Sequence, residues 1–429
     1  MKKNTSFRKV IHVMHLWVGI PCALFLFIIC LTGTIYVFNR EITQWVDGDR
    51  FKVTAPADAH PLPMVTLVSL LEKDQQGLTT TAVTIPSSKT QAWTFSMQQK
   101  AGKKGGKGDM AKDPKAKPKT WNFLVNPYTG RVQGDAQSTS YVFFNTVLQL
   151  HRWLLISNHD IGTAITGTAA ILMIFLQISG MILWLPAKLK GWKKRYAWKQ
   201  GFRIKFDATP KRLNFDLHKA LGFYTFLFIT IMALTGPAMA FDWYKAGFSR
   251  ALGVQPVKKG AENDLTSRAA SDTAGSIAIE TVLAKSNELF NYEGITRVTF
   301  PRNPTGVFNI QKTKEGFFAS AAIDRVFLDQ YTGAIVKLDR FSDKTLGQKI
   351  VTSIKPIHTG EMFGTLSKIF YFIACLLATS LPVTGIIIWW GRRNKKGKTA
   401  VAVKNGRMFG VKEKDIPVVA AQIQGDFRG

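Results

Sequence analysis

The chain has 429 residues, too many for one small domain, and 46% of them are hydrophobic. Its formal charge of +29 would suggest a nucleic-acid partner in a soluble protein. Here the basic residues cluster just outside long apolar runs, which favours membrane lipid, and no nucleic acid, as the partner. The cysteines Cys22, Cys30 and Cys375 all fall in apolar runs without metal-ligand spacing, so neither a disulfide framework nor a zinc site is indicated.

Four apolar runs are long enough to cross a bilayer core of about 30 Å as helices. They predict a membrane α-helical fold with spans at residues 11–38, 161–186, 214–241 and 364–390. The first run follows basic residues, as in a signal peptide. It is too long for one and ends in Tyr36-Val37-Phe38 rather than in small residues, so we expect it to stay attached as a helix.

The segments between the spans predict the orientation of the chain. Residues 187–213 carry ten Lys or Arg, and both the N-terminus (1–10) and the tail (391–429) begin with basic residues. Since short cytoplasmic segments are enriched in Lys and Arg, we expect these three parts in the cytoplasm. The long segments 39–160 and 242–363 would then lie in the periplasm of a bacterium, with the chain in the inner membrane.

Each long outer segment has the pattern of a small α+β domain. Strand-forming residues recur at 83–85, 92–95, 296–300 and 306–311. Each segment also has a turn of hairpin type, from Asn126 to Gly130 in the first and from Asp329 to Gly333 in the second. A lysine-rich, low-complexity stretch at 100–119 predicts a disordered insertion in a hairpin.

A near copy of the pattern in the first span returns 203 residues later in the third. The first copy runs from His15-Leu16-Trp17-Val18-Gly19 to Thr32-Gly33, and the second from His218-Lys219-Ala220-Leu221-Gly222 to Thr235-Gly236. In both copies the histidine precedes the closing glycine by eighteen residues. Together with the repeated turn, this indicates a tandem duplication of helix, outer domain and helix.

Six of the seven histidines lie at or near the ends of the predicted spans. Ionisable groups at membrane depth are costly and mark functional sites by default. The duplication pairs His15 with His218 at the inner ends, and His151 with His358 at the outer ends. The remaining histidines near span ends are His12 and His159.

A haem held between helices needs one imidazole on each side of the ring, and so from two different helices. His12 and His15 share one face of one helix, whereas His15 with His218, and His151 with His358, come from different helices. Two b-type haems would form an electron path across the membrane, bound without Cys-x-x-Cys-His attachment. A zinc site would need more ligands, and a proton relay a carboxylate inside the spans. Histidines that only make hydrogen bonds at helix ends remain an alternative.

These motifs resemble the PepSY-associated transmembrane proteins, also called iron-regulated membrane proteins. The resemblance covers about residues 8–395 and rests on the two His-x-x-x-Gly helices and the two Tyr-Thr-Gly turns. It also rests on Leu150-His151-Arg152 and on Pro356-Ile357-His358-Thr359-Gly360. It implies two PepSY-like periplasmic domains and four transmembrane helices. Some members of the family are di-haem ferric-siderophore reductases of the inner membrane.

The resemblance implies that His15 and His218 bind the iron of the cytoplasmic haem, and His151 and His358 that of the periplasmic haem. The second choices are His12 and His159; on one continuous helix, His159 would lie about two turns from His151. The predicted activity is reduction of a ferric siderophore or other ferric chelate, with electrons from an external donor, because no dinucleotide fingerprint is present. No further residue is assigned a catalytic role. A non-redox, membrane-anchored binding or regulatory protein is the alternative, and a transporter is a weaker one.

Overall fold

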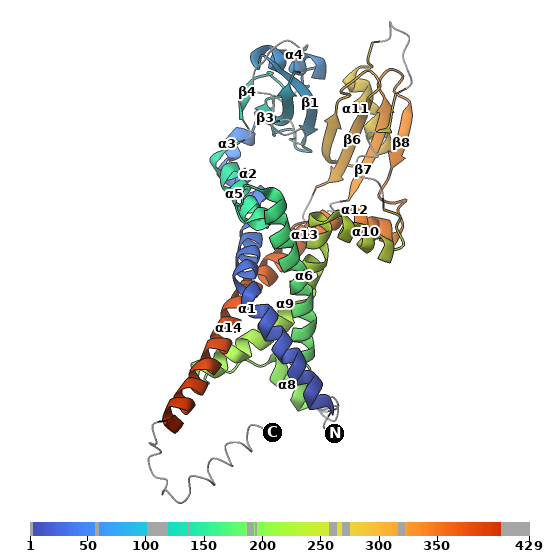
Figure 1. The fold of residues 1–429 in the computed structure, drawn as a ribbon. Coiled ribbons are helices and arrows are strands. Elements are labelled where there is room, and N and C mark those ends of the chain that lie inside the picture. The colour runs from blue at the N-terminus through green and yellow to red at the C-terminus, as the bar shows by residue number, and fades with distance from the viewer. Residues whose placement is uncertain are drawn as a thin grey trace, which may run out of the picture. The chain divides into compact units, whose positions relative to one another are not determined.

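The structure is a computed structural model, and four of its helices are long and apolar enough to cross a membrane (Figure 1). It describes residues 3–55, 60–100, 119–135, 137–186, 193, 195–256, 264–267, 275–315 and 322–404. The four long helices are α1 (Lys3–Tyr36), α6 (His159–Trp184), α9 (Pro210–Ala240) and α14 (Gly364–Lys404). A long apolar helix lies at each of the four predicted spans, with ends that differ by several residues. Most of the lysine-rich stretch at 100–119 lies outside the described residues.

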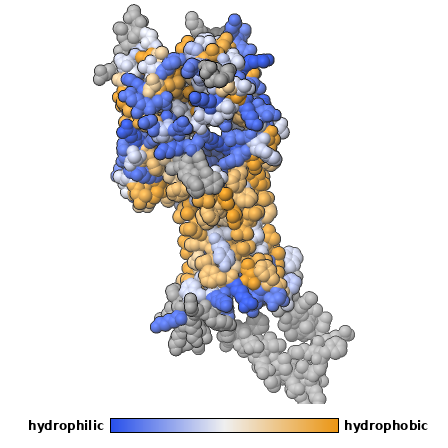
Figure 2. All heavy atoms as spheres, turned by 180° about the vertical axis from the view of Figure 1, so that it is seen from behind, coloured by the Kyte–Doolittle hydropathy of each residue, from blue (hydrophilic) through white to orange (hydrophobic). Residues whose placement is uncertain are grey.

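The face of these helices seen in Figure 2 is mostly apolar. Large hydrophobic side chains on them are widely exposed, among them Trp17 (73%), Leu227 (61%) and Leu376 (50%). Such an extent of exposed apolar surface is unfavourable in water but favourable against lipid tails. The chain is therefore a multi-pass membrane protein whose helices contact lipid.

The chain folds as two compact units. The first comprises residues 1–24, 178–223 and 380–429, and the second residues 25–177 and 224–379. Each long helix therefore contributes its two ends to different units.

In the first unit, Phe202 of α8 (Arg195–Phe202) packs against Trp184 at the end of α6 and against Phe223 of α9. The indole of Trp184 stacks on Phe223 with ring centres 4.2 Å apart and meets Phe202 edge-on at 5.0 Å. At the end of α6, the Arg8 guanidinium donates to the carbonyls of Leu183 and Leu185, the latter at 2.9 Å. A cation at a helix C-terminus both satisfies free carbonyls and opposes the negative end of the helix dipole.

The second unit contains one antiparallel sheet of eight strands in the order β4-β3-β2-β1-β5-β6-β7-β8. The strands are β1 (Leu78–Ile85), β2 (Trp93–Gln99), β3 (Thr120–Val125), β4 (Val132–Asp135), β5 (Gly294–Thr299), β6 (Val307–Lys314), β7 (Ile323–Asp329) and β8 (Ile335–Asp339). Helices α4 (Met64–Asp74) and α11 (Ile279–Leu289) cover one face, where Leu67, Phe95, Val282 and Ile310 are fully buried.

The two outer segments share this sheet, because β1 pairs with β5 from Ala82↔Thr299 to Ile85↔Thr296. The sequence predicted the strands and two separate α+β domains. The structure confirms the strands but joins them into one sheet. Ile279 and Leu283 of α11 pack on the hydrophobic clusters of both halves, which makes the core continuous across the junction.

Both predicted hairpin turns are confirmed, between β3 and β4 and between β7 and β8. In the first, the Asn126 side-chain oxygen accepts from the Tyr128 amide at 2.9 Å. In the second, Asp329 accepts from the amides of Tyr331 and Thr332, both at 2.9 Å. The closing glycines of both turns have positive φ, which favours glycine over any other residue.

Shorter helices flank the long ones. They are α2 (Asn39–Val46), α3 (Gly48–Phe51), α5 (Thr139–Trp153), α10 (Asp242–Ala251), α12 (Leu346–Thr352) and α13 (Ile354–Thr359). Helix α5 carries His151, and α6 begins at His159. The chain breaks between them at Leu154 and Leu155, which have φ of 54° and 58°. His151 and His159 therefore do not lie on one continuous helix.

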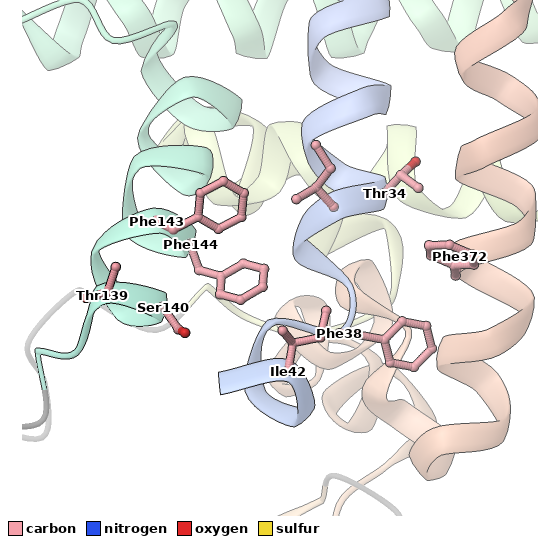
Figure 3. Close-up of a pocket in the computed structure, with 9 residues that line it drawn as sticks. Thr34, Phe38, Ile42, Thr139, Ser140, Phe143, Phe144 and Phe372 are labelled. Atoms are coloured by element: carbon pink, nitrogen blue, oxygen red, sulfur yellow. The ribbon is translucent and has the colours of Figure 1, made fainter. Parts of the chain in front are cut away.

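An apolar pocket of about 500 Å³ lies where α1, α2, α5 and α14 approach one another. Figure 3 shows phenylalanines from α5 and α14 on either side of the end of α1. The lining residues are Thr34, Ile35, Phe38, Ile42, Thr139, Ser140, Phe143, Phe144 and Phe372. With no charged side chain among them, this pocket is unsuited to a charged ligand.

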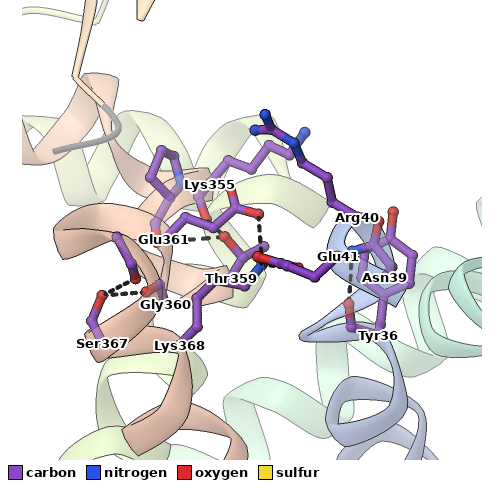
Figure 4. Close-up of polar contacts among 12 residues, drawn as sticks. Tyr36, Asn39, Arg40, Glu41, Lys355, Thr359, Gly360, Glu361, Ser367 and Lys368 are labelled. Atoms are coloured by element: carbon purple, nitrogen blue, oxygen red, sulfur yellow. Dashed lines mark hydrogen bonds and ion pairs between the residues drawn. The ribbon is translucent and has the colours of Figure 1, made fainter. Parts of the chain in front are cut away.

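An ion pair between a buried lysine and an exposed glutamate ties α2 to α14 beside this pocket (Figure 4). The Lys368 ammonium lies 2.7 and 2.8 Å from the two oxygens of Glu41, and 4.0 Å from the nearest oxygen of Glu361. Only 5% of the Lys368 side chain is exposed, against 42% for Glu41. The Lys368 ammonium therefore depends on its partners more than the Glu41 carboxylate does.

We expect Glu41→Gln to lower the melting temperature of the protein more than Lys368→Met. Glu41→Gln leaves a buried cation with only a distant carboxylate, a loss of about 1–3 kcal/mol. Lys368→Met leaves a carboxylate that water can reach. Thermal unfolding of the detergent-solubilised variants measures the difference, and an equal or reversed order would contradict this account of the pair.

Candidate functional site

The two outer histidines face each other in the second unit. His151 lies near the end of α5 and His358 near the end of α13. Their ring centres are 6.3 Å apart, and the ring planes are inclined at 65°. The sequence-predicted outer pair is thus brought together, each histidine from its own short helix.

The hydrogen bonds of His151 fix its protonation. Its Nδ1 lies 3.0 Å from the carbonyl oxygen of Ile29 and 3.1 Å from the Thr32 hydroxyl. A carbonyl can only accept, so Nδ1 carries the hydrogen. The Thr32 hydroxyl gives its own hydrogen to the Ile28 carbonyl at 2.6 Å and is left to accept. In a neutral ring with Nδ1 protonated, Nε2 keeps its lone pair for a metal.

His358 has the same arrangement on α9. Its Nδ1 lies 3.1 Å from both the Met232 carbonyl oxygen and the Thr235 hydroxyl. The Thr235 hydroxyl donates to the Ile231 carbonyl at 2.7 Å. Both outer imidazoles therefore donate through Nδ1 and keep Nε2 free of these helix contacts, as metal-binding histidines do.

Glycines give both rings their space. A Cβ at Gly33 would lie 3.3 Å from Cε1 of His151, and one at Gly236 would lie 3.4 Å from Cε1 of His358. A side chain longer than a methyl group would therefore displace the ring. The sequence alone is also consistent with glycines that only let helices pack closely. The structure shows that each of these glycines lies beside a histidine ring.

Burial keeps the outer pair uncharged. It lowers the pKa of His151 to about 4, and it lowers the pKa of His358 to about 4 with a further contribution from the nearby His151. Both imidazoles are neutral near pH 7, which is the form that binds metals.

The outer pair fits a metal held between two opposite imidazoles. Two metal–nitrogen bonds of about 2 Å, with the distance from each nitrogen to its ring centre, add to about 6 Å between ring centres. The described residues contain no group of three or more His, Cys, Asp or Glu that could hold a metal ion. A structural zinc site needs four ligands, so the pair suits a metal whose other ligands come from a macrocycle, as in haem.

The inner pair lies in the first unit, and each member contacts a neighbouring helix in the same way. Nδ1 of His15 on α1 is 2.8 Å from the Ser179 hydroxyl on α6, and a Cβ at Gly180 would be 3.4 Å from its Cε1. His15 and His218 both lie in this compact unit, so the structure brings the predicted inner pair into one part of the fold.

His218 on α9 makes the matching contact with α14. Its Nδ1 is 2.8 Å from the Thr384 hydroxyl, which donates to the carbonyls of Ser380 and Leu381 and so accepts from the ring. A Cβ at Gly385 would be 3.4 Å from Cε1 of His218. All four histidines therefore rest against a hydroxyl–glycine dipeptide on another helix: Ser179-Gly180, Thr32-Gly33, Thr384-Gly385 and Thr235-Gly236.

The second-choice histidines have other partners. Nε2 of His12 accepts from the Arg392 guanidinium at 2.7 Å. His159 is exposed and stacks on the indole of Trp153, with ring centres 3.9 Å apart and planes inclined at 8°. These contacts favour the predicted pairs over the alternatives.

Sequence reasoning missed the hydroxyl groups that orient the rings. Thr32 and Thr235 were part of the repeated motif, but their role was not assigned, and Ser179 and Thr384 were not noticed. The available signal was the dipeptide itself, since each long helix carries a Ser or Thr followed by Gly at the level of a histidine.

Comparison with known proteins adds one match to this geometry. The sequence model of the PepSY-associated TM region matches residues 13–392, which is nearly the whole chain. No curated protein matches the sequence. Because the match includes all four long helices, the sheet and the four paired histidines, the chain belongs to the PepSY-associated transmembrane family.

Proposed function

We propose that the protein is a di-haem membrane reductase that passes electrons to a ferric chelate outside the membrane. The observation that carries the proposal is the outer pair, with ring centres 6.3 Å apart and both Nδ1 atoms bonded to helix carbonyls. His15 and His218 would hold one b-type haem, and His151 and His358 the other. When bound, each haem would accept and donate one electron at a time.

The chain's own part is to hold the rings and keep them neutral. Threonine hydroxyls and main-chain carbonyls fix the orientation of each outer imidazole, and glycines leave room for it. Two neutral imidazoles would hold each haem iron and would leave it no position for oxygen, which favours electron transfer over oxygen chemistry. This supports the role of a conduit over that of an oxygenase.

We further propose that the sheet lies in the periplasm of a bacterium and that the chain arose by tandem duplication. The basic segments next to the spans support cytoplasmic termini. The contact of Thr32-Gly33 with His151 and the matching contact of Thr235-Gly236 with His358 support the duplication. Each electron delivered converts one Fe(III) to Fe(II), which hard oxygen donors hold more weakly, and it must come from an external donor.

The purified protein should contain two low-spin b-type haems per chain. His358→Ala and His151→Ala should each remove one haem, because a single imidazole remains at the outer site. His15→Ala should remove the other. Oxidised and dithionite-reduced absorption spectra, with a haem-to-protein ratio, measure this.

His159→Ala and His12→Ala are the matched controls for these variants and should keep both haems, since their side chains have other partners. A colourless protein produced with ample haem would contradict the proposal and favour a non-redox binding or regulatory protein. Full haem content in His358→Ala would contradict the outer assignment.

A graded pair of substitutions at Gly236 tests the space beside the outer ring. Gly236→Ala should retain most of the haem, because its Cβ would lie at contact distance from His358. Gly236→Leu should remove one haem by displacing the imidazole, while the inner haem stays. Haem content of both variants measures the effect, and loss of both haems or none in the leucine variant would disagree with it.

A further inference from the structure

The face of the sheet away from α4 and α11 is polar at its centre. Residues directly opposite one another in paired strands share a face. One such row crosses the β1–β5 junction as Thr94, Thr84, Arg297 and Gln311. The next row is Ser96, Ala82, Thr299 and Asn309. Seven of these eight side chains are polar, on strands from both halves of the sheet.

Arg297 stands at the middle of this face without an acidic partner. Its guanidinium donates to the Thr84 hydroxyl at 3.0 Å and reaches the Ser96 hydroxyl at 3.4 Å, and both acceptors are uncharged. Among the described residues no carboxylate forms an ion pair with it. Burial lowers the pKa of this guanidinium. A half-buried cation without an anion is unfavourable unless a ligand supplies one.

A second polar group on the same face also lacks a partner. The side-chain oxygen of Asn309 is buried and accepts no hydrogen bond within the part of the chain that the structure describes. Asn309 lies opposite Thr299, two residue pairs along β5 and β6 from the Arg297↔Gln311 pair and therefore on the same face. Arg297 and Asn309 are thus diagonal neighbours on one surface of the sheet.

The row that contains Arg297 is open to a ligand. Thr84, Thr94, Arg297 and Gln311 are all partly exposed, whereas Ser96 and Ala82 in the next row are buried. The apolar pocket near α5 has no charged group, so a charged substrate has no counterion there. Of these two places, the polar face alone carries a cation for an anionic ligand.

We propose that the polar face at the β1–β5 junction binds an anionic, oxygen-rich ferric chelate, with Arg297 donating to its carboxylate or catecholate oxygens. This inference rests on the proposed function, whose substrate it narrows to chelates of net negative charge. The planar guanidinium fork matches the paired oxygens of a carboxylate or catecholate.

Gallium(III) complexes test binding without reduction, because gallium(III) matches the charge and oxygen preference of ferric iron but accepts no electron here. The probes are gallium citrate and gallium tris(2,3-dihydroxybenzoate), with a neutral gallium trihydroxamate for comparison. Equilibrium dialysis against the full-length protein in detergent gives the affinities. Arg297→Gln is the test variant, Arg297→Lys keeps the charge without the fork, and Arg302→Gln removes an exposed arginine between β5 and β6.

The anionic complexes should bind the wild-type protein saturably and at least tenfold more weakly to Arg297→Gln, with Arg297→Lys in between. Arg302→Gln should bind like the wild type, and the neutral complex should bind weakly to all four proteins. Without ligand, Arg297→Gln should unfold at no lower a temperature than the wild type and should keep the same haem spectra. A loss of affinity then reflects a lost contact with the ligand.

Equal affinity of the wild type and Arg297→Gln, or no saturable binding of any anionic complex, would overturn the inference. Free citrate or inorganic phosphate binding as tightly as the gallium complexes would overturn it too, by reducing the face to a simple oxyanion site. A colourless protein whose affinity for the gallium complexes falls in Arg297→Gln would contradict the reductase but support the binding site. A protein with two haems whose affinity is unchanged in Arg297→Gln would support the reductase and contradict the binding site.

Discussion

The hydrogen bond from a histidine Nδ1 to a neighbouring helix is the contact on which the outer site depends. A ring held only by its own helix would be free to turn about its side-chain torsions, and its tautomer would be undetermined. The carbonyls of Ile29 and Met232 remove both freedoms, since they can only accept a hydrogen. The hydroxyl–glycine dipeptide supplies the second acceptor and the space. The contacts that pack the helices together therefore also orient the imidazole rings.

Much of this could be predicted from the sequence, because the signals are local or repeated. The four spans follow from apolar length alone, and the hairpins at Asn126 and Asp329 from turn chemistry. The pairing of His151 with His358 came from the duplication, and the structure brings the two rings within 6.3 Å. Their service as haem ligands stays a prediction.

Other features depend on contacts between distant segments, which no local pattern reveals. The pairing of β1 with β5 joins residues more than two hundred positions apart, so the two predicted domains emerged as one sheet. The break at Leu154 and Leu155 places two residues in a left-handed conformation that leucine rarely adopts. Neither position is a glycine, which is the usual sequence signal for such a break. Arg297 is one of many arginines in the sequence. Only the structure shows that its hydrogen-bond acceptors, Thr84 and Ser96, are uncharged.

The central claim is that pairs of neutral imidazoles hold iron between them. Electron paramagnetic resonance of the oxidised protein at low temperature tests it most directly, since the signal reports the axial ligands of each ferric haem. The account predicts two low-spin signals, with the outer one lost in His358→Ala. A high-spin signal from the wild-type protein would mean an open axial position, and the absence of any haem signal would mean that the four histidines serve another purpose.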